Sequence, residues 1–146
     1  MMLQNKVKLI SSMLMGISLF SYASISSAAN VGSSNFEIRL FNNTSLNQPL
    51  HYSVTSEGQA PVEGVLLVGD DNGKLIRVVG ESKDKAVAEI VVTDSAGHTV
   101  WDNKISYWGA SSEFYTNTVS LDSHYNVGTN AYPSIHAIGF DIRSQF

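Results

Sequence analysis

Apolar and polar residues alternate along most of the chain after residue 35. In FEIRL, residues 36–40, three apolar side chains alternate with Glu37 and Arg39, and LHYSV, residues 50–54, repeats the pattern. A period of two puts alternate side chains on opposite faces of an extended backbone, so these segments predict strands with one apolar face. The other segments of this kind are GVLLVG (64–69), KLIRVV (74–79), AVAEIVV (86–92), HTVW (98–101), KISYW (104–108), FYTNTVSL (114–121), HYNV (124–127) and SIHAIGFDI (134–142). No window has the spacing of an amphipathic helix, so the pattern predicts an all-β fold.

Short segments rich in Gly, Asn and Asp separate the expected strands. DDNG, residues 70–73, follows GVLLVG, and its Asn72-Gly73 dipeptide is typical of a tight hairpin turn. TDSAG, residues 93–97, predicts a second hairpin with Gly97 in the turn. Short strands at intervals of about 8 to 12 residues favour a two-sheet sandwich, because a second sheet must cover each apolar face. We expect a single antiparallel β-sandwich of about eight strands.

An outer-membrane barrel is the alternative all-β fold. Alternating apolar residues near Phe146 are weakly typical of the last strand of such barrels. The short, charged hairpins leave no continuous apolar band facing outward, which a barrel in a bilayer requires. The sandwich therefore remains the favoured fold.

The first residues of the chain have a different character. Lys6 and Lys8 precede an apolar run from Leu9 to Phe20, and the small residues SSAA end at Ala29. This order is typical of a secretory signal peptide. The apolar run, about 12 residues, is too short to span a bilayer as a helix. We expect a signal peptide at 1–29 and one exported domain at 30–146, secreted or periplasmic, without a transmembrane segment.

Loss of the signal peptide would make the chain more acidic. Without Lys6 and Lys8, 7 of the 9 basic residues face 13 acidic ones, a formal net charge of −6. Such a domain repels nucleic acid and anionic lipid. The expected partners are therefore neutral or zwitterionic lipid headgroups, or glycans. The chain has no cysteine, which excludes a disulfide framework and thiol chemistry.

Candidate catalytic and metal-binding residues are sparse. Asp122 and His124 would share one face of an extended segment, but a metal site would need further ligands from another strand, so metal binding by this pair stays open. No G-x-S-x-G motif occurs, and DDNG lacks the other oxygens of a calcium loop. We expect no catalytic residue, cofactor or metal, and hence a protein that is not an enzyme. A secreted enzyme or enzyme inhibitor is the remaining alternative.

Aromatic residues are concentrated late in the chain, where nine of the 12 that follow residue 29 lie after residue 100. In a strand, the neighbours Tyr107 and Trp108 point to opposite faces, and so do Phe114 and Tyr115. With Ile105 inward, Tyr107 is expected in the core and Trp108 on the surface. Exposed rings stack on sugars or anchor at lipid headgroups, while Asn and Asp bond hydroxyl groups. The expected ligand-binding residues are Trp101, Trp108, Tyr115, Asn117, Asp122 and Tyr125.

The segment from Leu75 to Leu121 resembles the middle of the aegerolysins. The resemblance is carried by a strand that ends in Gly80, a charged segment at 81–85, Asp94 with Gly97, the Tyr-Trp-Gly run at 107–109 and Thr116 with Asn117. The ending AIGFDI, residues 137–142, is similar to the last strand of that family. The chain lacks the cysteine and the Trp-Pro-Trp-Gly cluster that are usual there.

Aegerolysins are small acidic β-sandwich proteins that bind membrane lipids and can act with a larger pore-forming partner. The resemblance therefore implies a cytolysin-like protein that binds membrane lipid through its aromatic surface. A carbohydrate-binding or adhesin-like module that uses the same rings is the alternative.

Overall fold

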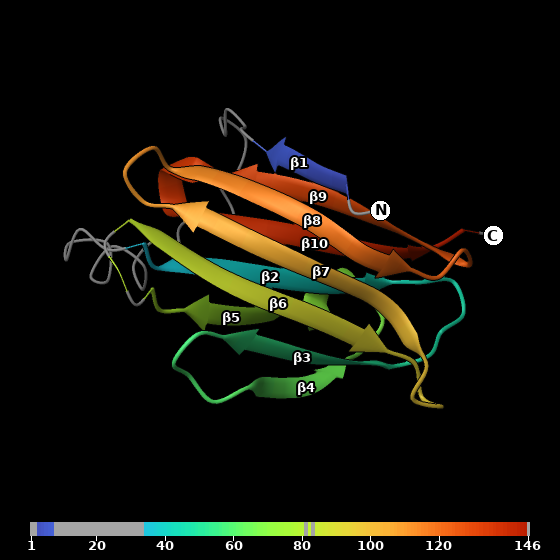
Figure 1. Ribbon diagram of the computed structural model, residues 1–146. Coiled ribbons are helices and arrows are strands. Elements are labelled where there is room, and N and C mark those ends of the chain that lie inside the picture. Colours follow the sequence, from blue (N-terminus) through green and yellow to red (C-terminus); the bar gives the residue numbers. More distant parts are fainter. Residues whose placement is uncertain (1–2, 8–33, 81, 83, 146) are drawn as a thin grey trace.

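A computed structural model of the chain describes residues 34–80, 82 and 84–145, and the backbone of residues 3–7. The described residues form ten strands and two short 3₁₀ helices (Figure 1). These are β1 (Leu3–Val7), β2 (Phe36–Asn43), β3 (Leu50–Ser56), β4 (Val62–Leu66), η1 (Asp70–Asn72), β5 (Lys74–Val78), β6 (Lys85–Thr93), β7 (Thr99–Trp108), β8 (Glu113–Leu121), β9 (Tyr125–Tyr132), η2 (Pro133–Ile135) and β10 (Ala137–Ser144). The prediction of an all-β fold is confirmed, with more strands than the eight or so expected.

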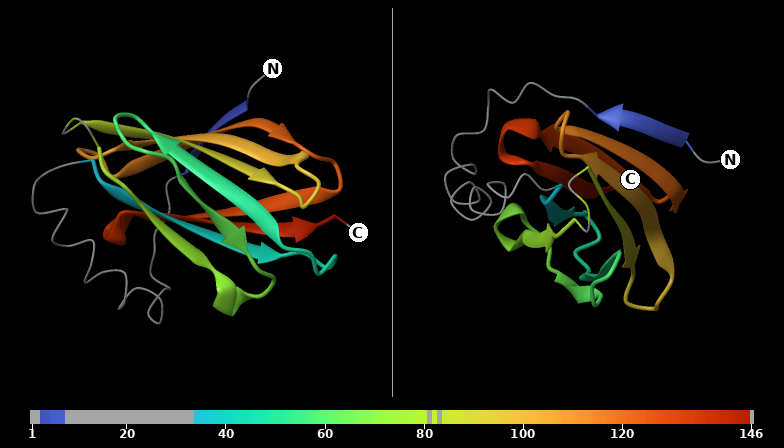
Figure 2. Two further views of the ribbon diagram at one scale, coloured as in Figure 1. Left: turned by 90° about the horizontal axis from the view of Figure 1, so that it is seen from below. Right: turned by 60° about the vertical axis from the view of Figure 1, so that its left-hand side comes forward.

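The strands belong to two sheets. The six-stranded sheet has the order β1-β8-β7-β6-β3-β4 and lies in front in Figure 1, and the four-stranded sheet has the order β5-β2-β10-β9 and lies behind it. In the left panel of Figure 2, the yellow and orange strands of the first sheet lie over the teal and red strands of the second. One cluster of buried side chains from both sheets fills the space between them.

The centre of the four-stranded sheet departs from the antiparallel arrangement that the sequence predicted. β2 and β10 run parallel, with Ala137 opposite Glu37 and Arg143 opposite Asn43. The remaining strand pairs in both sheets are antiparallel within the described residues. A parallel pair requires a connection that crosses between strands. Here β3 to β9 form that connection, and they include five of the six strands of the larger sheet.

The expected signal peptide lies outside the described residues except for 3–7. These five residues form β1, which pairs antiparallel with β8 from Leu3 opposite Thr118 to Val7 opposite Phe114. Cleavage after Ala29, and a domain that begins at residue 30, stay predictions. Among the described residues, no helix is long and apolar enough to cross a membrane.

Aromatic rings from both sheets meet in the core. Near one end, Tyr107 and Phe114 lie 4.5 Å apart between ring centroids, and Phe36 of the other sheet lies 5.6 and 5.5 Å from them. Further along, Trp101 packs on Phe140 at 4.9 Å. Such tilted and edge-on contacts add to the free energy gained by burying large rings. The Phe36–Tyr107–Phe114 cluster and the Trp101–Phe140 pair therefore stabilise the packing of one sheet on the other.

The two expected hairpin turns have different outcomes. The TDSAG hairpin is confirmed, because β6 and β7 pair across it, Gly97 has a φ of 88°, and the Asp94 carboxylate accepts backbone N–H bonds from Ala96 and His98. The DDNG hairpin prediction was wrong. β4 and β5 belong to different sheets, so DDNG connects the sheets, with Asp70–Asn72 in a 3₁₀ turn.

Glycine is needed at position 73 for a reason other than positive φ. Gly73 has a φ of −62°, which any residue can adopt, and the positive φ of this loop, 115°, is at Gly69. A Cβ atom at Gly73 would overlap Cε1 of Phe41. A side chain here would therefore displace the Phe41 ring.

A buried asparagine links the two sheets near this loop. The Asn42 side chain is fully buried, and its amide nitrogen donates to the carbonyl oxygens of Gln48 and Leu66 at 2.9 and 3.0 Å. Its carbonyl oxygen accepts from the backbone N–H and the hydroxyl of Thr44 at 3.2 and 2.8 Å. The backbone oxygen of Asn42 also accepts from Gly69 at 2.9 Å. Asn42 thus joins the ends of β2 and β4, the β2–β3 loop and the connection into η1.

We expect Asn42→Ala to destabilise the fold by about 3 kcal/mol, because it leaves several buried backbone and hydroxyl groups without partners. Urea unfolding measures this loss. Asn126→Ala, at an exposed position of β9, is the matched control and should change the free energy of unfolding by about 0.5 kcal/mol or less. Equal stability of the two variants would show that the Asn42 bonds are dispensable.

Candidate functional site

Three of the expected ligand-binding residues meet on the outer face of the six-stranded sheet. Along β7, Trp108, Ser106 and Lys104 point outward, opposite Glu113, Tyr115 and Asn117 of β8. On the other side, Lys85 of β6 lies opposite Trp108. Trp108, Tyr115 and Asn117 therefore occupy successive rows of one surface. We call this surface the aromatic face and define it as Lys85, Lys104, Ser106, Trp108, Tyr115 and Asn117.

The aromatic pairs divide between core and surface as the alternation predicted. Tyr107 and Phe114 are fully buried, whereas Trp108 is 40% exposed and Tyr115 is partly exposed. The Lys85 ammonium lies 5.0 Å from the centroid of the Trp108 ring, within the range of a cation–π contact. The Trp108 ring is therefore held in place and still accessible on the surface.

The buried member of the first pair also has a polar role. The Tyr107 hydroxyl hydrogen-bonds Nδ1 of His136, a residue in the left-handed conformation between η2 and β10. Burial lowers the pKa of His136 and raises that of Tyr107. Both groups are thus favoured in their neutral forms, so this contact links the two sheets without buried charge.

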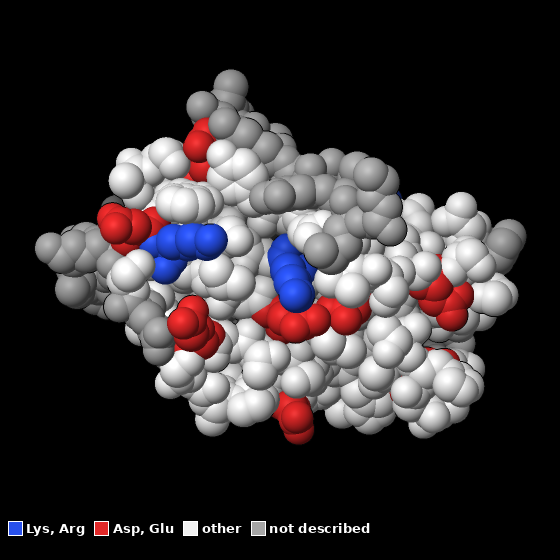
Figure 3. Space-filling model, viewed as in Figure 1, with Lys and Arg blue, Asp and Glu red and all other residues white. Residues whose placement is uncertain are grey.

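Acidic and basic side chains lie close together on this side of the molecule. Figure 3 views this side of the molecule and shows blue basic side chains next to red acidic ones. Asp102 of β7 has a pKa raised to about 6, first because it is partly desolvated and then because of the hydrogen bond and negative charge of Glu89, while Lys104 acts in the opposite direction. Asp102 therefore takes up a proton at a higher pH than an ordinary aspartate does.

The other three expected ligand-binding residues lie elsewhere. Trp101 is only 2% exposed and packs in the core on Phe140, and Tyr125 is 8% exposed. The Trp101 ring therefore lies inside the protein, and only a small part of Tyr125 reaches the surface. Asp122 lies in the turn between β8 and β9, where with Asp94, His124 and Tyr125 it lines a hollow of about 190 Å³. The structure thus separates these residues from the aromatic face.

Asp122 has local partners. Its carboxylate accepts the backbone N–H of His124 at 2.9 Å and lies 2.8 Å from Nδ1 of the same histidine. The backbone bond is the main reason that the pKa of Asp122 is lowered. No group of three or more His, Asp or Glu side chains is placed to hold a metal ion in the part of the chain that the structure describes. The Asp122–His124 contact therefore stabilises the turn between β8 and β9.

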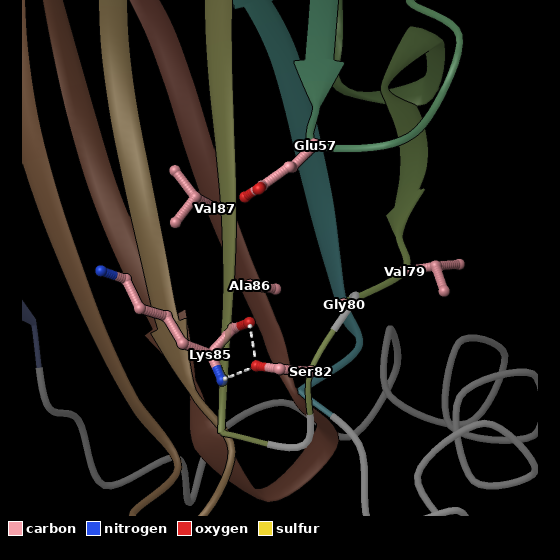
Figure 4. Close-up of a pocket in the computed structure, with 7 residues that line it drawn as sticks. All are labelled: Glu57, Val79, Gly80, Ser82, Lys85, Ala86 and Val87. Atoms are coloured by element: carbon pink, nitrogen blue, oxygen red, sulfur yellow. Dashed lines mark hydrogen bonds between the residues drawn. The ribbon is translucent and has the colours of Figure 1, made fainter.

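A cleft of about 280 Å³ opens where β6 begins, between the ends of β3 and β5 (Figure 4). In Figure 4, the Glu57 side chain points towards Val87, while that of Lys85 points away from Ser82. The Ser82 hydroxyl bonds both backbone groups of Lys85 at 3.2 Å. These bonds fix the start of β6, and with it the stem of the lysine that contacts Trp108.

A further hollow, larger than the two described above, was not predicted from the sequence. It measures about 560 Å³ and lies on the outer face of the four-stranded sheet. Its walls come from β2, η1, β5, β9 and β10. The alternation in β2 could have pointed to it, because the outward row of Glu37 and Arg39 continues to Phe41 and Asn43. In the structure Glu37 and Arg39 are buried, and Phe41 and Asn43 are half-buried.

Comparisons with known proteins do not assign the chain to a family. No protein-family model matches it, and no curated protein matches it. The resemblance to aegerolysins therefore stays an interpretation of the sequence.

Asp102→Asn should stabilise the protein near neutral pH. The folded-state pKa, about 6, lies above the ordinary value of 3.8, so the folded protein binds this proton more tightly than the unfolded chain. The resulting stability is present below about pH 4 and is lost as the pH rises to about 6. Asparagine mimics the protonated acid and avoids the loss. Thermal unfolding should show the variant more stable than the original at about pH 7, with little difference at about pH 3.5.

Asp94→Asn is the control for this measurement, because hydrogen bonds from His98 and Ala96 lower the pKa of Asp94. Its effect near neutral pH should have the opposite sign. A destabilised Asp102→Asn protein at about pH 7 would contradict the raised pKa of Asp102 in the folded protein.

Proposed function

We propose that the chain is an exported, non-enzymatic binding protein whose aromatic face takes a neutral glycan. One observation carries this proposal: Trp108, Tyr115 and Asn117 lie in successive rows of one outer face. An exposed indole ring can stack on the apolar face of a sugar, and flanking hydroxyl, amide and ammonium groups can bond the hydroxyls of the next sugar units. Strand rows about 7 Å apart on one face match an extended oligosaccharide.

The distribution of the rings favours a glycan over a lipid surface. Interfacial anchoring uses several exposed aromatic residues at the same depth, but Trp101 and Tyr125 are buried. Trp108 is the only aromatic among the large exposed apolar side chains of the described residues. A single exposed ring surrounded by polar groups is a better stacking platform than a membrane anchor.

A zwitterionic lipid headgroup is the second candidate ligand. Val119 and Leu121, both more than 40% exposed, extend the surface along β8 beyond Asn117. Apolar side chains near an exposed Trp could enter the headgroup region. The resemblance to aegerolysins supports this candidate, and with it a larger pore-forming partner.

The domain organisation belongs to the same proposal. Residues 1–29 act as a cleaved signal peptide, and residues 30–146 form a single β-sandwich that is secreted or periplasmic. The order of basic, apolar and small residues supports the first part. The core shared by the two sheets supports the second.

Trp108→Ala should abolish ligand binding and leave the fold intact, since it removes an exposed ring with a free energy cost of about 1 kcal/mol or less. Tyr107→Ala, its neighbour in sequence, should cost about 3 to 5 kcal/mol by opening a cavity in the core. Thermal unfolding of both variants separates these effects. Severe unfolding of Trp108→Ala would show that its ring is structural.

Binding should be measured with the purified exported protein on an array of neutral oligosaccharides, and by co-sedimentation with phosphatidylcholine liposomes. The proposal expects binding on the array that is lost in Trp108→Ala and retained in Asn126→Ala. Sedimentation with liposomes in the absence of glycan binding would replace the glycan by a lipid. Glycan binding that survives Trp108→Ala would reject the aromatic face as the site.

A further inference from the structure

We propose a second binding site, on the opposite side of the molecule, that takes a small neutral polyol such as a single sugar residue. The site is the hollow on the outer face of the four-stranded sheet, which we call the β2 pocket. Its volume of about 560 Å³ lies within the range of small-molecule sites. The lining residues are Arg39, Phe41, Asn43, Asp70, Asp71, Gly73, Lys74, Leu75, Asn130 and Asp141.

An aromatic ring and an exposed leucine form the apolar wall of the β2 pocket. Phe41 is partly buried and Leu75, on the neighbouring strand β5, is 40% exposed. The Phe41 ring lies against the backbone of Gly73, where no other residue would leave room for it. The ring is therefore fixed, and its remaining exposed surface is available for stacking on a sugar.

Asn43 aligns two carboxylates at the polar wall. Its amide nitrogen donates to Oδ1 of Asp70 at 2.7 Å and to Oδ1 of Asp141 at 2.6 Å. The other oxygen of Asp141 accepts from Arg143 at 2.8 and 2.6 Å. Both amide hydrogens of Asn43 are thus engaged, while its carbonyl oxygen accepts no hydrogen bond from the described residues.

The groups left available in the β2 pocket are mainly acceptors. They are the Asn43 carbonyl oxygen, the second oxygen of Asp70 and both oxygens of Asp71. None of these atoms makes a hydrogen bond to the described residues. Asn130, on β9, adds an amide that can donate and accept. A ligand that pairs with these acceptors must carry several hydrogen-bond donors. Hydroxyl groups supply donors without adding charge to the ligand.

The charges of the β2 pocket disfavour ionic ligands. Arg39 is almost fully buried and paired with Glu37 at 3.0 Å, and its guanidinium lies 6.0 Å from the centroid of the Tyr132 ring. Asp70, Asp71 and Asp141 outnumber Arg39 and Lys74 in the lining, so an anion would be repelled. A divalent cation would have to compete with Asn43 and Arg143 for the Asp141 oxygens. A neutral ligand avoids both costs.

The loop that carries Asp70 and Asp71 is held before any ligand arrives. Gly69 donates its N–H to the Asn42 backbone oxygen at 2.9 Å, and the Asn72 amide donates to the Val68 oxygen at 2.8 Å. Neither bond uses an atom of the pocket wall. A ligand would therefore bind without ordering this loop, which reduces the entropic cost of binding.

The test is an NMR titration of the ¹⁵N-labelled exported protein with methyl glycosides of neutral hexoses and N-acetylhexosamines. We expect saturable shifts at the side-chain amides of Asn43 and Asn130, and none near Trp108. Asp71→Ala removes only an exposed carboxylate and should weaken binding roughly three- to tenfold. Phe41→Ala, which removes the stacking ring, should weaken it by roughly tenfold.

Controls separate this site from the aromatic face. Asn126→Ala, on the same strand as Asn130, and Trp108→Ala should both leave the titration unchanged. The same titration is repeated with CaCl₂ alone. The proposal is overturned if no glycoside shifts the Asn43 and Asn130 amides, if Asp71→Ala and Phe41→Ala bind as tightly as the original, or if calcium alone gives the shifts. Loss of glycan-array binding in Trp108→Ala, with the titration intact, would show that the two sites are independent.

Discussion

The buried side chain of Asn42 is the constraint on which much of the structure depends. It occupies a position that the alternation of β2 assigns to an apolar residue, after Phe36, Ile38 and Leu40. Both of its amide hydrogens and its carbonyl oxygen are used, so the cost of burying a polar group is offset. Because its partners lie on β4 and in two connections, one side chain sets the relative position of both sheets at this end. Phe41 and Asn43, the residues on either side of Asn42, both line the β2 pocket, so the position of Asn42 also affects the shape of that pocket.

Much of the fold could be predicted from alternation, because burial on one face of a strand is a local property. Parity placed Tyr107 inward and Trp108 outward, and the same parity applies to Trp101, which shares the inward face with Ile105 and Asn103. Alternation along β7 from Ile105 thus predicts an inward position for Trp101, although the residue was expected to bind ligand. The irregularity of pairing near Val92 places Val100 inward as well, and no pattern of single residues predicts such a bulge.

What could not be predicted depends on contacts between distant segments. DDNG has the composition of a hairpin turn, but β4 and β5 pair with β3 and β2 instead of each other. The residues of a turn determine its local backbone conformation. They do not determine which sheet the following strand joins. The β2 pocket was missed for the same reason. Asn43, Asp70 and Asp141 look like ordinary solvated residues until the sheet brings them within hydrogen-bonding distance.

The parallel pairing of β2 with β10 determines when the smaller sheet can form. Ala137 pairs with Glu37, 100 positions earlier, and β10 stands at the centre of its sheet between β2 and β9. Without β10, β2 has only β5 beside it, and the Trp101 ring lacks Phe140. The sheet is therefore completed only when the last strand has been synthesised, and closing so long a loop slows folding. If the chain is exported as we propose, slow folding would keep it unfolded, and so able to pass through a translocation channel, until β10 has been made.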